Sequence, residues 1–205
     1  TPASGFINAV MYNTDLVQGA DVPTGYKDLG DPKWQGKIYM ADPVQSTSAY
    51  GSLRAIYYAG GWELVEAIAK NLVISDNFAG PRAISDGEAP LGLYNEPAAS
   101  AYLSNPNVEP TYPSEGVTGG WTSVFLIKGG PNPENAKTFI DWFFSEDGQR
   151  MIAEDLPGLR PSRIDAPKPS DLPAIDSIKV IPLPDDAISN KKEYLAKWEE
   201  IITNV

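Results

Sequence analysis

Cysteine and histidine are both missing from this 205-residue sequence. Without cysteine the chain has no disulfide and no thiol nucleophile. Without either residue it has no thiolate or imidazole zinc site, and no catalytic triad or general base built on histidine. No run of apolar residues reaches the roughly 18 needed to span a membrane as a helix. These absences exclude several classes of enzyme and metalloprotein before any motif is considered.

Positive charge is also scarce, because 16 lysines and arginines stand against 27 aspartates and glutamates, for a net charge of −11. A chain with this charge is repelled by nucleic acid and by anionic membranes, so neither is expected as a partner. Hydrophobic residues make up 42% of the chain and charged residues 21%, the balance of a globular protein. The length suits one large domain or two small lobes.

Patterns typical of strands and helices alternate along the chain. Apolar, β-favouring segments predict strands at 6–12, 38–41, 72–74, 90–94 and 121–128, with 108–112 as a further extended segment. Amphipathic spacing and capping residues predict helices after Ser48, at 62–71, 81–87, 98–103, 146–154 and 191–203, and from Pro133 onward. The segment 156–186 is proline-rich and is expected to be irregular. This order predicts a mixed α/β fold.

The stretch from Met40 to Trp62 places three hydroxyl residues between a strand end and a helix that the pair Gly60-Gly61 should end. The hydroxyls are Ser46, Thr47 and Ser48. The first turn of a helix offers unpaired N–H groups and a positive dipole end, which suit an anion or a polar ligand. A simple helix cap is the alternative, but it accounts for only one of the three hydroxyls. Arg54 is expected on the outer face of this helix.

Four stretches give the sequence a family resemblance. They are YNTDLV at 12–17, DLGDPKWQGKI at 28–38, DP through STSAY at 42–50, and PNPENAK at 131–137 running on to SEDGQ at 145–149. In this order and spacing they resemble the solute-binding proteins of bacterial ABC importers with the type II periplasmic binding fold. The group that binds ferric ion, phosphonates and sugar phosphates is the most similar, over about residues 6–163.

The resemblance implies an α/β fold of two lobes joined by crossing strands, with a ligand held in the cleft between them. Residues 1–11 would form a hinge-crossing strand, 12–117 lobe 2, and 118–163 the returning part of lobe 1. Residues 164–205 would be an irregular segment and a C-terminal helix that packs back on lobe 2. Members of the family carry further polypeptide before the position of Phe6, so lobe 1 is expected to be incomplete and the chain to be a fragment.

An incomplete lobe 1 would expose apolar side chains on its strand and helix. These are Phe125, Ile127, Phe139, Ile140 and Phe143. The cost of leaving them in water predicts that this surface pairs with a second copy of the chain or with a separate N-terminal piece.

By the same resemblance, eight residues are expected to face the ligand: Ser46, Thr47, Ser48, Tyr94, Asn95, Glu96, Glu115 and Trp121. A phosphonate, a sugar phosphate or another small anion or zwitterion would rest on the helix start, and Tyr94, Asn95 and Glu96 would contact its other end. Glu115 has the alternative of a solvated loop carboxylate, and Trp121 that of packing at the hinge.

Ferric iron is the alternative ligand. Iron binders of this group use two adjacent tyrosines after the strand that corresponds to Leu91–Tyr94, whereas here Asn95 follows Tyr94. Half of the pair is therefore absent, although Tyr94 with Glu96 keeps the alternative open. No metal and no cofactor are expected in the leading interpretation.

The leading hypothesis for function is capture of a small solute for delivery to an ABC permease in the membrane, without catalysis. Its location would be periplasmic or extracellular, with a lipid anchor in a Gram-positive-type cell. An enzyme on the same fold is the second hypothesis, and it would depend on Glu96 and Glu115 as the acid–base pair. The sensor half of a transcription regulator is the third, although no DNA-binding motif is present.

Overall fold

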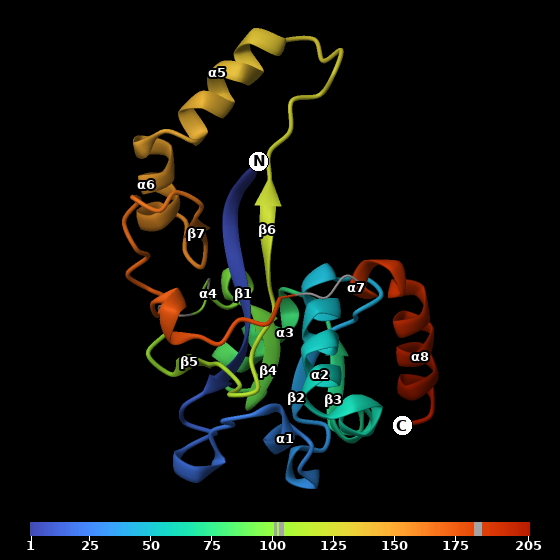
Figure 1. Cartoon of the computed structure of the whole chain (residues 1–205). Helices are drawn as coiled ribbons and strands as arrows, with labels where there is room; N and C mark the ends of the chain where they lie inside the picture. The colour runs from blue at the N-terminus through green and yellow to red at the C-terminus, as the bar shows by residue number, and fades with distance from the viewer. Residues whose placement is uncertain (101, 103–104, 183–185) are drawn as a thin grey trace.

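The computed structural model describes residues 1–100, 102, 105–182 and 186–205. Figure 1 shows two parts joined by long strands. The main body holds the sheet β3-β2-β4-β1-β5 with helices on it. The second part, which we call the arm, comprises residues 119–163 and rises away from the sheet with α5 and α6 at its far end.

Strand β1 (Pro2–Asn13) belongs to both parts. Its second half pairs antiparallel with β4 (Leu91–Asn95) and β5 (Val108–Thr111) in the main body. Its first half pairs antiparallel with β6 (Gly119–Ser123) and β7 (Arg160–Pro161) in the arm. One continuous strand therefore carries the connection between the two parts.

The remaining strands and the helices complete the main body and the arm. Strand β2 (Ile38–Ala41) lies parallel to β3 (Leu72–Ser75) on one side and to β4 on the other. The helices are α1 (Tyr26–Leu29), α2 (Thr47–Ala69), α3 (Ala79–Ser85), α4 (Glu96–Ser100), α5 (Pro133–Phe143), α6 (Glu146–Asp155), α7 (Asp186–Ser189) and α8 (Lys191–Thr203). Within the described residues, short 3-10 segments lie at Gly19–Asp21, Pro32–Trp34 and Ile175–Ser177. Of the helices in the described residues, none combines the length and the apolar character that a membrane crossing requires.

The core of the main body lies between the sheet and the helices that cover it. Apolar side chains of β1, β2, β4 and α2 meet in one cluster, in which Met11, Met40, Leu53 and Leu91 are fully buried. Helix α2 changes direction at Gly60 and Gly61, which have non-helical backbone angles, as the glycine pair predicted. Such burial of large apolar side chains is the main driving force for folding this part of the chain.

Helix α8 begins and ends at the residues that the sequence predicted, Lys191 and Thr203. Trp198 and Ile201 of this helix are both buried against the main body. Arg54 of α2 lies beneath α7 and α8, and its side chain is fully buried. The expectation of an outer-face position for Arg54 is therefore wrong, because the C-terminal helices cover that side of α2.

Strand β6 is shorter than the predicted strand at 121–128. It ends at Ser123, which pairs with Pro2, and the Val124 N–H then donates to the Thr1 carbonyl. Beyond that point no strand among the described residues offers a partner to 124–128. The prediction was wrong at this end because an apolar, β-branched sequence indicates burial, whereas a strand also needs a neighbouring backbone.

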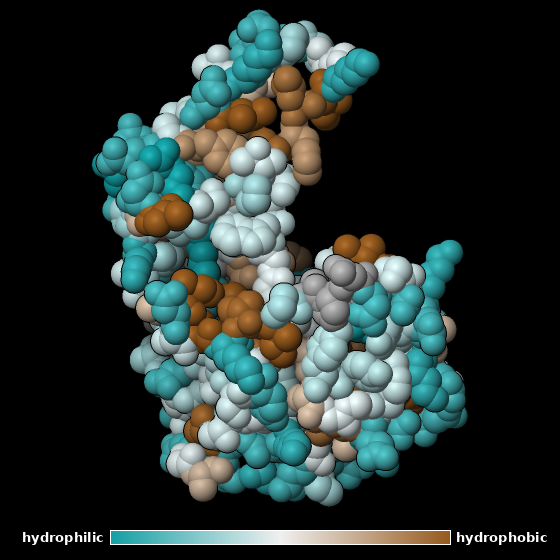
Figure 2. All heavy atoms as spheres, in the orientation of Figure 1, coloured by the Kyte–Doolittle hydropathy of each residue, from teal (hydrophilic) through white to brown (hydrophobic). Residues whose placement is uncertain are grey.

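The far end of the arm carries exposed apolar side chains. Phe125 is 76% exposed, Ile127 77% and Phe139 53%. Helix α5 buries none of its residues, and its aromatic rings pack on one another, with the Phe139 and Phe143 rings 5.7 Å apart. Figure 2 shows the resulting hydrophobic area at the end of the arm, above the hollow that separates the arm from the main body.

Candidate functional site

The start of α2 is the first candidate site. Ser46 caps the helix, and its Oγ accepts a hydrogen bond of 3.3 Å from the Ala49 N–H. The Ser46 and Ser48 hydroxyls lie 3.0 Å apart and share a hydrogen bond, while Thr47 is exposed. Among the described residues no acceptor is found for the N–H groups of Thr47 and Ser48. The segment of α2 before the kink at Gly60 therefore presents two unused N–H donors and a positive dipole end at this point.

Three polar side chains that the sequence did not single out surround this helix start. The Nδ2 of Asn8 in β1 donates to the Ser48 carbonyl at 3.1 Å and to Thr118 Oγ1 at 2.9 Å. The Nδ2 of Asn77 donates to Ser46 Oγ at 3.4 Å. Two signals could have found them: Asn8 is a polar residue in an otherwise apolar strand, and Asn77 follows the carboxyl end of β3.

Asn95 lies on the same side of the sheet as this cluster. It is directly opposite Asn8 in the pairing of β1 with β4, and opposite residues of an antiparallel pair project to one face. Its Oδ1 accepts a hydrogen bond of 2.8 Å from the Ala98 N–H and so caps α4. The structure thus brings Asn95 near Ser46, Thr47 and Ser48, at the carboxyl edge of the parallel strands, where ligands of α/β proteins bind.

Glu96 has a different environment from the ligand contact that the sequence suggested. Its side chain is 1% exposed and forms an ion pair with Arg160, in which Nη2 lies 2.6 Å from Oε1 and Nε lies 2.9 Å from Oε2. The Ile7 N–H and the Tyr112 hydroxyl donate to the same carboxylate. Burial and the Glu96 charge raise the pKa of Tyr112 well above its usual range. Both oxygens of the Glu96 carboxylate are therefore already hydrogen-bonded to protein groups.

Tyr94 also points into the protein. Its side chain is 3% exposed, and a Cβ added at Gly80 in α3 would collide with its hydroxyl. Burial raises the pKa of this hydroxyl above its usual range. The residue therefore packs between β4 and α3, which is the opposite of an open metal ligand.

Glu115 and Trp121 lie apart from the start of α2. Glu115 packs against the beginning of α1, where its Oε1 lies 3.5 Å from the Lys27 N–H and its carboxylate fills the space beside Gly25. Trp121 is 60% exposed, and its ring covers Gly5, where a Cβ would sit 3.1 Å from the ring. The eight predicted residues thus fall into a cluster of four at the helix start, two buried residues and two separate ones.

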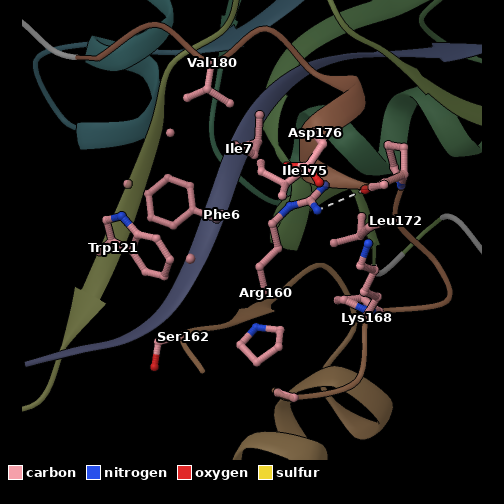
Figure 3. A pocket seen from close by; sticks show the side chains of 18 of the residues that line it. Phe6, Ile7, Trp121, Arg160, Ser162, Lys168, Leu172, Ile175, Asp176 and Val180 are labelled. Carbon is pink, nitrogen blue, oxygen red and sulfur yellow. Dashed lines mark hydrogen bonds between the residues drawn. The ribbon is translucent and has the colours of Figure 1, made fainter. Parts of the chain in front are cut away.

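A cavity of about 840 Å³ lies beside the hinge strands. Figure 3 shows Phe6, Ile7, Trp121, Arg160 and Ile175 on its walls. Ile7 packs on Val117 and Ile178, whereas its neighbour Asn8 reaches the start of α2. The cavity and the helix start are lined by different residues, because the cavity walls include neither Asn8 nor any of residues 46–48. Of the predicted site residues, only Trp121 lines the cavity.

No group of three or more acidic side chains in the described residues is placed to hold a metal ion. The two residues that kept ferric iron open are the buried Tyr94 and the ion-paired Glu96. Neither presents a vacant oxygen to the hollow in this conformation.

Both the sequence and the fold resemble those of known proteins. Residues 4–191 match the model of a family described as bacterial extracellular solute-binding protein. Iron uptake protein A1 of Synechocystis sp. is 30% identical over an alignment of 169 residues that covers 71% of this chain and 45% of that protein. Phosphoglycerate transport regulatory protein PgtC of Salmonella typhimurium is 29% identical over 146 residues, 68% of this chain and 36% of that protein.

Solved structures resemble the fold at lower sequence identity. The periplasmic binding protein AfuA of Actinobacillus pleuropneumoniae, with fructose-6-phosphate bound, gives a TM-score of 0.83 at 21% identity and covers 100% of this chain and 69% of that one. Iron-bound HitA of Pseudomonas aeruginosa gives 0.79 at 19% identity and covers 98% of this chain and 68% of that one.

The chain spans 45% or less of the length of these curated relatives. The likeness to solved structures extends over both the main body and the arm, and it establishes the type II periplasmic binding fold. The family model covers nearly all of the sequence. The chain therefore belongs to the family of bacterial extracellular solute-binding proteins.

Proposed function

We propose that this protein is the solute-binding component of an ABC importer and that it holds a small anionic or zwitterionic solute at the start of α2. The single observation that carries the proposal is the hydroxyl-rich beginning of α2, with Thr47 exposed, beside the hinge strands. Unused N–H donors and a helix dipole at such a point favour a phosphate, phosphonate or carboxylate group.

The residues have distinct roles in this proposal. The N–H groups of Thr47 and Ser48 and the Thr47 hydroxyl would donate to the anion. Ser46 would hold the helix start through its cap, and Asn95 would contact the part of the solute away from the anion. Tyr94, Glu96 and Glu115 would support the scaffold, because the first two are buried and the third lies at α1. Trp121 would pack at the hinge.

A sugar phosphate or phosphonate suits this donor set better than ferric iron. The helix start offers nitrogen and hydroxyl donors, whereas ferric iron needs several negatively charged or neutral oxygen ligands. The relatives do not decide the matter, since their names and titles include both an iron uptake protein and a protein with fructose-6-phosphate bound. Iron is kept as the second candidate because the relative with 30% identity is named for iron uptake.

Binding without catalysis is the proposed activity. The two carboxylates considered for acid–base chemistry, Glu96 and Glu115, lie in different environments, and Glu96 is ion-paired to Arg160. Acid–base catalysis needs a group within hydrogen-bond reach of the reacting atoms. We propose delivery to an ABC permease, in the periplasm or outside the cell, and membership of an extracellular solute-binding family supports this.

The proposed domain plan assigns residues 1–11 to a hinge strand, 12–117 to lobe 2 and 118–163 to the returning part of lobe 1. Residues 164–205 would then lead back to lobe 2 and cover it with α8. The proposed ligand would lie in the hollow between the arm and the main body. In the isolated chain, the apolar end of the arm would pair with a second copy.

Thermal-shift measurements on the full natural chain test the proposal. The probes are fructose-6-phosphate, inorganic phosphate, 2-aminoethylphosphonate and ferric citrate. A ligand that binds only the folded state raises the melting temperature with increasing concentration. We expect at least one phosphorylated probe to do so, and we expect Thr47→Pro, which removes one N–H donor at a position where helices accept proline, to reduce the shift. A shift with ferric citrate alone would favour the iron alternative, and no shift with any probe would contradict the proposal.

A further inference from the structure

The carboxylate of Glu96 sits where the main body, β1 and the arm meet. Each of its oxygens accepts two hydrogen bonds. Oε1 accepts from Arg160 Nη2 at 2.6 Å and from the Tyr112 hydroxyl at 2.8 Å. Oε2 accepts from Arg160 Nε at 2.9 Å and from the Ile7 N–H at 3.1 Å.

The partners of Glu96 come from different parts of the chain. Glu96 begins α4 and Tyr112 follows β5, so both belong to the main body. Arg160 starts β7, which belongs to the arm. Ile7 pairs with Gly119 of β6 in the arm and directly precedes Asn8, the first residue of β1 that pairs with β4. The only side-chain ion pair between arm and main body in the described residues is therefore this one.

The contact continues on both sides of the ion pair. Arg160 Nη1 donates to the Pro173 carbonyl at 3.0 Å, which ties the same guanidinium to the segment that leads back to the main body. Gly158 approaches α4 so closely that an added Cβ would lie 2.6 Å from the Glu96 carbonyl oxygen. The turn before β7 is thus fitted to the start of α4.

We propose that the Glu96–Arg160 ion pair is a hinge clasp that fixes the angle between the arm and the main body, and that these two residues therefore set solute affinity without touching the solute. The link to affinity rests on the proposed function, whereas the clasp itself does not. A bidentate, charge-assisted pair holds a defined geometry better than a single hydrogen bond. In proteins that close around a ligand, a few residues at the hinge control the relative position of the parts.

Electron–electron distance measurements on spin-labelled protein test the clasp directly. The chain has no cysteine of its own, so Lys137→Cys in α5 and Lys192→Cys in α8 give one label on each part. Both positions are exposed. The labelled protein is diluted with unlabelled protein so that only distances within one molecule are recorded.

Three backgrounds separate the clasp from general stability. Glu96→Gln keeps the shape but removes the ion pair. Glu96→Leu with Arg160→Met removes both charges, and replacement of a buried ion pair by apolar residues of similar volume is often neutral for stability. Tyr112→Phe is the matched control, because it removes a hydrogen bond to the same carboxylate within the main body and leaves the link to the arm intact.

We expect a single narrow distance distribution for the parent protein and for Tyr112→Phe. Glu96→Gln and the Leu/Met double variant should both give a broader or displaced distance distribution. We expect this even if the double variant has the same melting temperature as the parent protein. A narrow, undisplaced distribution in the folded double variant would overturn the clasp. The affinity test uses fructose-6-phosphate or inorganic phosphate, depending on which of them gives a thermal shift with the parent protein. Its dissociation constant for the double variant should differ from that for the parent protein. An unchanged constant would overturn the link to affinity and leave the proposed binding site standing.

Discussion

We expect the isolated 205-residue chain to associate with itself through the end of the arm. Phe125, Ile127 and Phe139 are 76%, 77% and 53% exposed. Side chains of this size present on the order of 150–200 Å² each, so the three expose about 400 Å² of apolar surface. If two copies each bury about half of this area, the gain is about 10 kcal/mol at roughly 25 cal/mol per Å².

Association also has a cost, which we take as about 4–15 kcal/mol for lost translational and rotational freedom. The balance is a net gain of about 6 kcal/mol at most, which corresponds to a dissociation constant on the order of tens of micromolar at the tightest and of millimolar for a gain of about 4 kcal/mol. Sedimentation velocity over a concentration series covering that range should therefore show a sedimentation coefficient that increases with concentration.

Serine at Phe125, Ile127 and Phe139 together should remove most of the association. The matched control is Ile188→Ser, because Ile188 in α7 is 84% exposed but lies on the main body. This control should associate like the parent chain. A well-folded parent chain that stays a monodisperse monomer at the highest concentration would refute the reasoning, since the apolar surface would then need no cover.

Three further predictions concern stability, each measured by urea denaturation. Gly158→Ala should lower the free energy of unfolding by on the order of 2–4 kcal/mol, because an added Cβ would collide with α4. The control Gly36→Ala has the same positive φ but open space around it, so it should lower the free energy of unfolding by only about 1 kcal/mol. Equal losses in the two variants would contradict this prediction. Burial and a neighbouring carboxylate raise the pKa of Tyr12 from 10.0 to about 12. The neutral Tyr12 hydroxyl therefore contributes fully to the stability of the fold below pH 10, and this contribution is lost as the pH rises through 12. Between pH 10 and pH 12 the parent protein should therefore lose stability relative to Tyr12→Phe. A difference in stability between the two proteins that stays constant over this pH range would contradict the prediction. Arg54→Met should leave the free energy of unfolding nearly unchanged. Asp186→Asn should lower it by about 1–3 kcal/mol, because the buried Arg54 guanidinium would lose its counter-charge. A larger loss for Arg54→Met than for Asp186→Asn would refute this prediction.

Local pattern was enough to predict the elements that local forces decide. Helix α8 begins and ends at the predicted residues, because an apolar face with polar flanks defines both ends. Helix α6 begins at the predicted residue, Glu146, and Ser145 caps it, with its Oγ accepting from the Gly148 N–H. The predicted strand at 121–128 failed beyond Ser123, since strand pairing depends on where a distant segment lies.

The candidate site could be predicted only in part for the same reason. Ser46, Thr47 and Ser48 form a local motif at a helix start, which sequence spacing can indicate. The environment of Glu96 depends on Arg160, which is 64 residues away in the sequence and gives no local sign of the pairing. The burial of Arg54 likewise depends on α7 and α8, more than 130 residues further on.

A titration followed by backbone amide signals in nuclear magnetic resonance tests the central claim most directly. The probe is the phosphorylated compound that gives the largest thermal shift, added to the full natural chain. Our account predicts that the largest shifts occur at the amides of Thr47 and Ser48, with smaller ones at Asn77 and Asn95. Shifts concentrated instead on residues of the cavity beside the hinge strands, such as Trp121 and Ile175, would contradict the claim that the start of α2 holds the solute.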